Sequence, residues 1–409
     1  MRLALLTQHF APHFEGGTEA LVRAQAREFA RRGVDVTIIA GTDRPHRGVD
    51  VETAEVDGLR VSFVPRLPSE PYDLVLERPR VARLVAELAA EADLVHLHHH
   101  STLDGGLVRE LRAGGRPVVV TLHDLFVTCP RFFRVPPDAA LSCGARDEFE
   151  PCVPCIAPDA GDTPEAALLA GLRARARGMQ AELDAAALVC VPSATHAERL
   201  RRLVRLETSR LVVVPNGLTS PLERVVTSGW EAAREPLRVL FLGHLAEVKG
   251  VEDVAVATRG LANVELHCLG KAVDPAVAER LRAAGAHLHG EYAASELAAR
   301  VAALRPHLAV IPSRAYESYG LTLDEAHALG LPAWVGDRGA LGERVGAAGR
   351  VLPARDPAAW RAALLALFDE PAALEAERLA VPRELPGPEA SAARLLAEYD
   401  RLADASTPR

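Results

Sequence analysis

The chain has 409 residues, of which 49% are hydrophobic and 25% charged, and its formal net charge is -8. This length exceeds one ordinary core and predicts two domains, and the acidic balance excludes a general affinity for nucleic acid. No signal peptide and no run of about 20 apolar residues is visible, so a cytoplasmic location is expected. In a reducing cytoplasm the six cysteines favour metal binding or free thiols over disulfides.

The first elements along the chain predict a βαβ unit. Residues 3–7 form an apolar run of strand length, residues 19–32 place their apolar side chains on one helical face, and residues 34–40 form a second strand-like run. The loop between them contains Gly16 and Gly17 but lacks the Gly-x-Gly-x-x-Gly pattern of a dinucleotide site. The glycine pair either serves only the turn or lets a ligand approach the backbone closely.

Histidines follow two predicted strands of the first half. Residues 93–98 form a strand that runs into consecutive histidines at 98–100, and residues 117–122 form a strand that ends at His123 and Asp124. Neighbouring side chains on a strand point to opposite faces, so the consecutive histidines are expected to line a strand end rather than to ligate one metal. Ligands of open α/β sheets bind at the carboxyl ends of the strands. His123 is therefore a candidate for contact with a ligand hydroxyl group, and Asp124 for orienting that ring or contacting the ligand, while a simple cap of the next turn is the alternative.

A cysteine cluster occupies residues 129–155, a proline-rich stretch with few periodic apolar residues. Such a segment cannot form much core, and a metal would hold it together. Cys152 and Cys155 form a C-x2-C half-site that is common for tetrahedral Zn²⁺. An iron–sulfur cluster has the same ligand set, and four unrelated thiols are the plainer alternative. The expected zinc ligands are Cys129, Cys143, Cys152 and Cys155.

A long helix and then a linker are predicted in the middle of the chain. The helix spans residues 163–186 and carries Arg173, Arg175 and Arg177 close together. These arginines are expected to form a solvated face, with contact to an anionic lipid surface or a phosphorylated ligand as the alternative. Residues 223–236 are polar and irregular, which predicts the linker between the two domains.

The second half opens with a predicted strand over residues 237–243, which is followed by His244 and then by Lys249 at a helix start. A lysine there can place its ammonium group against a pyrophosphate, although a lone lysine is usually a surface residue. A short strand is predicted over residues 288–291, directly before Tyr292.

Residues 308–337 carry the most informative pattern, a strand, a loop, a helix and a further strand, which implies a parallel sheet. Glu317 falls in the loop and Glu325 in the first turns of the helix. The residues that follow Glu317 at the helix start are Ser318, Tyr319, Gly320, Leu321 and Thr322. Their backbone N–H groups form a ready anion site. The loop thus offers carboxylates for sugar hydroxyl groups and amides for phosphate, whereas two glutamates without this context would be expected only to cap or solvate a helix.

The stretch from Glu317 to Glu325 resembles the Glu-x7-Glu signature of the retaining family 4 glycosyltransferases. The resemblance covers nearly the whole chain and implies the GT-B fold, two Rossmann-like β/α/β domains facing across a cleft. It places an acceptor-side domain at residues 1–222, a donor-side domain at 236–383, and a helix at 388–404 that crosses back to the first domain. The cysteine cluster is similar to that of a subset of the family.

The same resemblance implies roles for individual residues. Lys249 would meet the charge developing on the departing diphosphate, Glu317 would hold the donor sugar, and His123 would line the reacting face. Asp124 would contact the acceptor, and Glu325 would bind the ribose. The residues implied in donor binding are Gly16, Gly17, His244, Tyr292, Ser318, Tyr319, Gly320, Leu321, Thr322 and Glu325, with Glu15 and Glu19 as weaker candidates.

One of these positions departs from the family pattern. His244 stands where the family has an arginine, and histidine is neither permanently charged nor bidentate. This substitution weakens the expected phosphate clamp, so Lys249 is expected to carry more of the charge neutralisation.

The implied reaction moves a sugar from a UDP- or GDP-sugar to a hydroxyl acceptor with retention at the anomeric carbon, in bacterial surface polysaccharide, glycolipid or secondary-metabolite synthesis. No cofactor is required for catalysis, and the zinc would be structural. The enzyme would be cytoplasmic, with peripheral contact to the inner leaflet of the cell membrane as a further expectation. The alternatives are a GT-B sugar-nucleotide epimerase, a non-catalytic two-domain sugar-nucleotide-binding protein, and a degenerate regulatory transferase.

Overall fold

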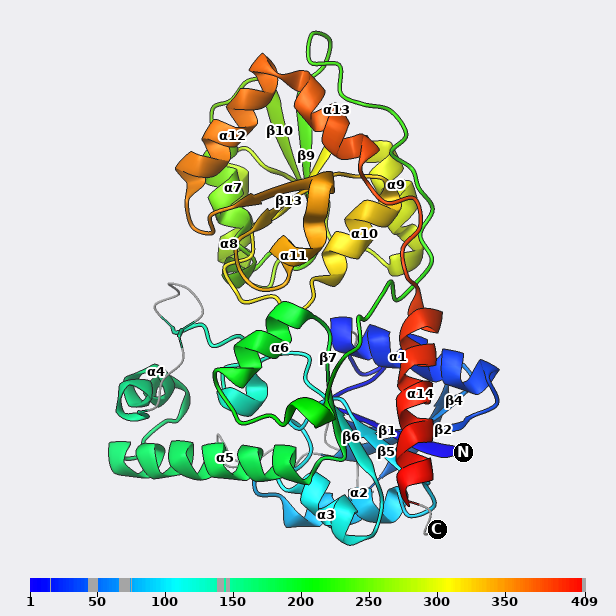
Figure 1. The fold of residues 1–409 in the computed structure, drawn as a ribbon. Coiled ribbons are helices and arrows are strands. Elements are labelled where there is room, and N and C mark those ends of the chain that lie inside the picture. Colours follow the sequence, from blue (N-terminus) through cyan, green and yellow to red (C-terminus); the bar gives the residue numbers. More distant parts are fainter. Residues whose placement is uncertain are drawn as a thin grey trace. The chain divides into compact units, whose positions relative to one another are not determined.

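A computed structural model describes residues 1–14, 16–42, 51–65, 74, 76–137, 143–144 and 148–406. Within these residues the chain forms two compact units. The N-terminal unit comprises Met1–Pro137, Cys143–Thr219 and the segment from Pro388 onward, and the C-terminal unit comprises Ser220–Gly387. Each unit is built on a parallel-rich sheet flanked by helices (Figure 1).

The sheet of the N-terminal unit has the strand order β3-β4-β2-β1-β5-β6-β7-β8 in the described residues. Its strands are β1 Arg2–Thr7, β2 Asp35–Thr42, β3 Glu52–Val56, β4 Leu59–Pro65, β5 Leu94–Leu97, β6 Val118–Thr121, β7 Leu188–Val191 and β8 Leu211–Val213. The β3–β4 pair is antiparallel and the other neighbours run parallel. Strands β5, β6 and β7 are buried along their whole length, which explains their continuous apolar sequences.

Helices cover this sheet, and the last one comes from the far end of the chain. The α-helices of the unit are α1 Gly17–Arg31, α2 Pro79–Leu88, α3 Leu107–Ala113, α4 Val153–Ile156, α5 Glu165–Ala185, α6 Ala194–Arg201 and α14 Pro388–Ser406. Short 3-10 helices are η1 Phe126–Thr128, η2 Glu150–Cys152, η3 Ala157–Asp159 and η4 Thr208–Arg210. Helix α14, red in Figure 1, packs against α1 and buries Leu395 and Tyr399 in the same core as Phe29.

The sheet of the C-terminal unit is parallel throughout, with the order β11-β10-β9-β12-β13-β14. Its strands are β9 Leu237–Leu242, β10 Val264–Leu269, β11 His287–Leu288, β12 Leu308–Ile311, β13 Ala333–Gly336 and β14 Gly349–Leu352. The α-helices are α7 Val251–Thr258, α8 Pro275–Ala283, α9 Leu297–Leu304, α10 Leu321–Leu329, α11 Leu341–Val345, α12 Pro357–Asp369 and α13 Pro371–Leu379. Short 3-10 helices are η5 Glu247–Lys249, η6 Ala294–Glu296 and η7 Gly346–Ala348.

Two apolar clusters form the core of this second unit. One contains Trp334 and Trp360, and the other contains Leu323 and Leu329 of α10. A parallel sheet needs cover on both faces because its strands are apolar on both sides. The carboxyl ends of β9, β10, β12 and β13 therefore remain as the edge where polar loops gather.

Helix α5 corrects part of the expectation for its three arginines. Arg175 is 3% exposed, donates to the carbonyl oxygens of Leu74 (3.1 Å) and Phe126 (2.6 Å), and lies over the Phe126 ring. Arg173 and Arg177 are exposed. Arg175 is thus a structural residue that holds loops on the helix, and only its two neighbours belong to a solvated face. The described residues contain no helix long and apolar enough to cross a membrane.

Candidate functional site

The C-terminal unit brings Lys249 and Glu317 into contact although 68 positions separate them. Lys249 closes η5 after strand β9, and Glu317 lies in the loop after β12. The Lys249 Nζ is 2.7 Å from Glu317 Oε1, and the Ser313 hydroxyl donates to the same oxygen at 2.8 Å. The side chains of Lys249 and Glu317 are 33% and 13% exposed. Burial opposes ionisation of Glu317, but the ammonium group of Lys249 outweighs it and holds the pKa of Glu317 below its usual value.

Backbone bonds explain why the two loops meet. The N–H groups of Arg314 and Ala315 both donate to the carbonyl oxygen of Val248, at 3.0 and 3.1 Å. The Arg314 guanidinium group also binds Asp253 of α7 through two nitrogens, at 2.9 and 2.6 Å. This bidentate pair fixes the β12 loop to the start of α7, and the lysine and the glutamate are positioned by that junction.

The start of α10 is the segment in which the sequence analysis expects an anion site. Gly320 precedes the helix with φ 86°, a left-handed conformation that glycine adopts without steric cost. A side chain at this position would also collide with Leu341 of α11. The first N–H groups of α10, including those of Leu321 and Thr322, have no acceptor within the helix. They are therefore available for a phosphate group.

Arg344 of α11 holds this helix start in place. Its guanidinium group donates to the carbonyl oxygens of Tyr319 (2.8 Å) and Gly320 (3.1 Å), forms an ion pair with Asp324, and lies 3.5 Å from the centre of the Tyr319 ring. Burial raises the pKa of Asp324, and Arg344 opposes that rise. The sequence analysis missed Arg344, because nothing in its local pattern marks it.

Glu325 lies one turn into α10 and has an unusual protonation state. Burial, with a smaller effect of Asp324, raises the pKa of Glu325 to about 7. Burial also raises the pKa of Tyr292, and the nearby Glu325 adds to this effect. Tyr292 and Glu325 therefore lie close together. A carboxyl group that changes charge near neutral pH is typical of functional sites.

His244 and Ser318 complete the predicted donor residues of this unit. His244 is exposed directly after β9, and Ser318 is half-buried beside Glu317. The backbone of Glu317 itself pairs with the loop after β13, where Ala340 N donates to Glu317 O at 2.8 Å. All of these residues lie at the carboxyl ends of β9, β12 and β13, the edge where ligands of such sheets bind.

The N-terminal unit carries a buried histidine network at the carboxyl ends of β5 and β6. His98 Nδ1 is 3.0 Å from His123 Nε2, and the two rings stack. His96 Nε2 is 2.7 Å from Thr121 Oγ1, and its other nitrogen meets the Tyr399 hydroxyl. Burial lowers the pKa of His96 and of His123 to about 3 and that of His98 well below its usual value. These rings are neutral at physiological pH, so His123 can exchange hydrogen bonds with a ligand but carries no charge.

Asp124 and the two remaining histidines have separate partners. His99 Nε2 lies 3.2 Å from Asp124 Oδ2, and Phe126 N donates to Asp124 Oδ1 at 2.8 Å. Asp124 therefore caps the η1 turn, the plainer of the sequence expectations, and it also orients His99. His100 Nε2 is 3.8 Å from Glu182 of α5. The consecutive histidines follow the end of β5 and reach three different partners, so they do not converge on one site.

The glycine pair lies where the sequence places it. Gly16 precedes α1 and Gly17 is its first residue. Glu19 is 3% exposed and accepts from Gln8 Nε2 at 3.3 Å, and burial raises the pKa of Glu19. Glu15 lies outside the described residues. Gln8, at the end of β1, also accepts from Ser101 Oγ at 2.8 Å, so it links the glycine loop to the loop after β5.

The structure gathers the loops that bear the four cysteines of the cluster. Cys143 N donates to Arg134 O at 2.7 Å, and Arg131 Nη2 donates to Cys155 O at 2.8 Å. Cys152 and Cys155 pack beside a small apolar cluster that includes Ile156. In the part of the chain that the structure describes, no three histidine, cysteine, aspartate or glutamate side chains are arranged to hold a metal ion. Positions 138–142 and 145–147 of the predicted loop lie outside the described residues.

Comparison with known families matches both units. A family model described as a glycosyl transferase 4-like domain matches residues 16–217, and one described as glycosyl transferases group 1 matches residues 236–370. The curated D-inositol 3-phosphate glycosyltransferase 1 of Catenulispora acidiphila is 27% identical over 94% of this chain and 90% of its own length.

Solved structures share the fold of the chain. Sucrose-phosphate synthase from Thermosynechococcus elongatus has a TM-score of 0.70 at 22% identity and covers 99% of both chains. An α,α-trehalose-phosphate synthase (UDP-forming) from Burkholderia xenovorans, in complex with glucose-6-phosphate, has a TM-score of 0.65 at 12% identity, over 98% of this chain and 100% of that one.

Two parallel-rich α/β units of this kind define a GT-B glycosyltransferase, as the sequence predicts. The two matched models cover most of the chain between them and name the same activity for each unit. The chain belongs to glycosyltransferase family 4.

Proposed function

We propose that the enzyme transfers a sugar from a nucleoside diphosphate donor to a hydroxyl acceptor with retention at the anomeric carbon. The observation that carries this proposal is the 2.7 Å contact between Lys249 Nζ and Glu317 Oε1 beside the start of α10. One cation, one carboxylate and several free N–H groups converge there. This set matches a diphosphate linked to a sugar.

The chemistry is electrostatic. As the bond between the sugar and the diphosphate breaks, negative charge develops on the leaving phosphate oxygen. The Lys249 ammonium group and the amides of Gly320 to Thr322 would stabilise this charge in a fixed arrangement. Glu317 would accept hydrogen bonds from hydroxyl groups of the donor sugar once Lys249 turns to the phosphate. Glu325 would accept from the ribose hydroxyl groups, and Tyr292 would contact the base, with Gly16 and Gly17 approaching the donor from the N-terminal unit.

The acceptor side would rely on a neutral histidine and a carboxylate. His123 would accept or donate a hydrogen bond at an acceptor hydroxyl group, because burial keeps its ring uncharged. Asp124 would contact a second acceptor hydroxyl group. Burial opposes the ionisation of Asp124, but His99 and the hydrogen bonds that Asp124 accepts lower its pKa. A GT-B epimerase lacks an acceptor, and so the acceptor dependence of the product separates the two reactions.

A panel of UDP- and GDP-sugars with candidate acceptors tests the proposal. D-inositol 3-phosphate belongs in the panel because the relative from Catenulispora acidiphila carries that substrate in its name. We expect an acceptor-dependent glycoside whose anomeric configuration, read by NMR, equals that of the donor. The Glu317→Ala enzyme is expected to lose most transfer. An inverted product, an altered nucleotide-sugar without acceptor, or full activity of Glu317→Ala would contradict the assignment.

We propose in addition that Cys129, Cys143, Cys152 and Cys155 bind one structural Zn²⁺. Four thiol groups in loops that Arg131 and Arg134 hold together support this proposal, because thiolates are the preferred ligands of structural zinc. Elemental analysis of reduced protein is expected to find about one zinc per chain, and Cys152→Ser with Cys155→Ser to remove it. Iron in place of zinc would indicate an iron–sulfur cluster, and the absence of any metal would reject the site.

We propose finally a cytoplasmic enzyme that contacts the inner leaflet at the membrane surface. The exposed Arg173 and Arg177 of α5 support this proposal, since exposed basic side chains favour anionic lipid headgroups. Cell fractionation is expected to find the enzyme partly with the inner membrane and to release it at high salt. Recovery in the soluble fraction alone, at low as at high salt, would remove the membrane part of the proposal.

A further inference from the structure

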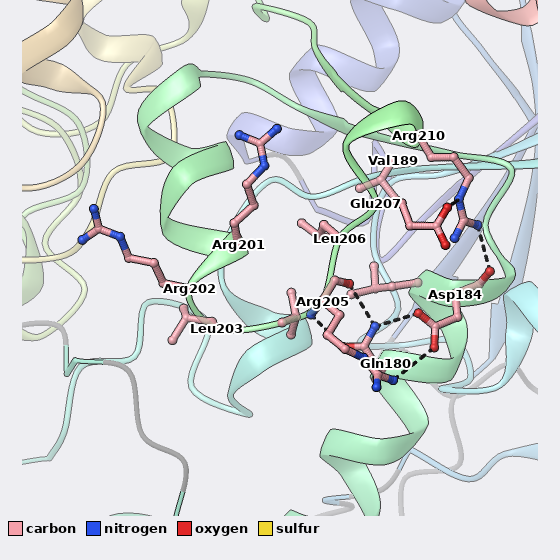
Figure 2. A pocket seen from close by; sticks show the side chains of 12 residues that line it. Gln180, Asp184, Val189, Arg201, Arg202, Leu203, Arg205, Leu206, Glu207 and Arg210 are labelled. Carbon is pink, nitrogen blue, oxygen red and sulfur yellow. Dashed lines mark hydrogen bonds and ion pairs between the residues drawn. The ribbon is translucent and has the colours of Figure 1, made fainter.

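A polar hollow of the N-terminal unit lies away from the histidine network. It is a cavity of about 890 Å³ between the end of α5, strand β7, the end of α6 and the loop that leads to β8 (Figure 2). Helix α5 ends just before β7 begins, and the loop over residues 202–210 ends where β8 begins. The cavity therefore lies at the amino ends of β7 and β8, whereas His123 and Asp124 follow the carboxyl end of β6.

Arginine dominates the lining of this cavity. Its charged residues are Arg201, Arg202, Arg205, Arg210, Asp184 and Glu207. The lining holds four guanidinium groups and two carboxylates, so it carries a net positive charge within a protein whose total charge is -8. A local charge opposite to that of the whole chain indicates a ligand of negative charge.

The cavity wall is held rigidly by one amide and one arginine. Gln180 Nε2 donates to Asp184 Oδ1 (2.8 Å) and to Arg205 O (3.0 Å), and Gln180 Oε1 accepts from Arg205 N (2.9 Å). Arg210 Nη1 donates to the carbonyl oxygens of Asp184 (2.9 Å) and Ala186 (2.8 Å). These bonds tie the loop to the end of α5, so the cavity is a formed structure rather than a gap under a loose loop.

The other arginines can turn to a ligand at little cost. Arg205 is 3.6 Å from Asp184 Oδ2, and these two side chains are 83% and 51% exposed. Arg202 pairs with Glu198, and both are about two-thirds exposed. Exposed pairs of this kind contribute little stability and exchange readily with other partners. The Arg201 side chain is exposed and makes no hydrogen bond or ion pair within the described residues. Figure 2 shows it extending from the end of α6, apart from the bonded group around Asp184.

A smaller hollow of about 520 Å³ adjoins the first. It shares Gln180, Asp184 and Arg205 with it and adds Arg173 and Arg177 of α5. The floor of the larger cavity includes Leu183 and Val189, each 3% exposed, and an apolar wall strengthens the attraction between charges above it.

We propose that this cavity, which we call the arginine pocket, binds the phosphate group of a ligand that is separate from the sugar donor. Guanidinium groups bind phosphate in a bidentate manner, and a doubly charged oxyanion balances the excess positive charge of the lining. Arg201 and Arg205 are the binding residues, Arg202 assists them, and Arg210 with Gln180 positions the loop. The phosphate belongs either to a soluble phosphorylated molecule or to a lipid headgroup, two sources with the same recognised chemistry.

Calorimetry with inorganic phosphate tests the soluble source. All proteins in this experiment carry the substitution Lys249→Ala, so that the ammonium group of the C-terminal unit does not contribute to phosphate binding. The pocket variant carries Arg201→Gln and Arg205→Gln. It is expected to bind phosphate more weakly by roughly tenfold for each guanidinium group removed. The matched control Arg282→Gln/Arg394→Gln removes the same charge from exposed positions outside the pocket and is expected to leave the affinity unchanged.

Sedimentation with vesicles tests the lipid source in the same set of proteins. Vesicles of phosphatidylglycerol in phosphatidylcholine are compared with phosphatidylcholine alone. Loss of binding in the pocket variant alone, to phosphate or to the phosphatidylglycerol vesicles, supports the proposal and identifies the source. Equal affinities of the pocket variant and the control variant for both probes, or no binding of either probe before the pocket is altered, would overturn it.

Discussion

The carboxyl edges of the two sheets differ in the kinds of polar residue that they carry. In the C-terminal unit the edge is charged, with Lys249 and Glu317 paired at 2.7 Å and still partly exposed. In the N-terminal unit the edge joins a neutral histidine, because burial lowers the pKa of His123 to about 3, to the carboxylate of Asp124, whose pKa is lowered. A diphosphate needs charge to balance it, whereas an acceptor hydroxyl group needs only hydrogen-bond partners. Sheets of the same architecture thus carry edges of different charge, and the burial of the edge loops decides which groups are ionised.

The largest expected effect is at the charged edge. Replacing Lys249 by alanine removes the cation that we propose for the leaving diphosphate, and we expect kcat to fall by about 100- to 1,000-fold. Lys249→Arg keeps the charge and should retain part of the activity. Steady-state kinetics of the unchanged enzyme, Lys249→Ala and Lys249→Arg measure these values of kcat. A kcat for Lys249→Ala close to that of the unchanged enzyme would show that the charge of Lys249 is not needed for transfer.

Glu325 gives the charged edge its own pH dependence. Its pKa is about 7 in the folded protein, above the ordinary value of 4.5. The folded state therefore holds more protons than the unfolded state between these values, and stability falls as pH rises through this window. The stability lost across this window is at most about 3 kcal/mol. We expect the Glu325→Gln protein not to show this loss, because glutamine does not titrate.

Urea unfolding of the Glu325→Gln protein at pH 5 and pH 8 measures this difference. The exposed Glu343, changed to glutamine, is the matched control and should follow the unchanged protein. If Glu325→Gln shows the same pH dependence as that control, then Glu325 is an ordinary carboxylate and the site loses its titrating group.

The buried histidines of the N-terminal unit are expected to give the stability of the protein the opposite dependence on pH. Burial lowers the pKa of His96 and His123 to about 3, from an ordinary value of 6.5. The unfolded state then binds more protons than the folded state between these values, so stability falls as pH decreases below 6.5. Each such histidine costs about 2 kcal/mol by pH 5. His123→Gln should reduce the slope of unfolding free energy against pH by about one proton, while the exposed His287→Gln should not change it.

The smallest effect concerns Arg344, which positions the start of α10 without belonging to the charged pair. Arg344→Gln removes the bonds to the carbonyl oxygens of Tyr319 and Gly320. Without these bonds the backbone amides at the start of α10 lose their fixed direction. We therefore expect the nucleotide affinity to fall by about tenfold and kcat at saturation to change less. Calorimetry with the nucleoside diphosphate tests this against Arg282→Gln, an exposed arginine of α8. Equal affinities would show that the helix start needs no such support.

Sequence patterns predicted the elements and the residues at their ends with good success. The strand that ends before Pro312, the turn at Gly320 and the helix over Leu321–Leu329 follow from local periodicity and glycine placement. They could be predicted because each depends on neighbours within a few positions. The predicted family followed from the same segment, and the matched models confirm it.

Side-chain partners were predicted less well. Arg175 was expected on a solvated face and is buried, because the loops that cover α5 come from residues near Leu74 and Phe126. Nothing in the sequence around Arg344 marked it as a support for the start of α10. Burial and pairing depend on segments far apart in the chain, and local periodicity carries no record of them.

The amino-acid sequence by itself determined the parallel α/β architecture, the two units and the identity of the polar residues at the strand ends. Only the tertiary structure decided that Lys249 meets Glu317, that His98 meets His123, and that four arginines enclose one pocket. The physical reason is that backbone periodicity is set by adjacent residues, whereas the environment of a charge is set by whatever the packed chain places around it.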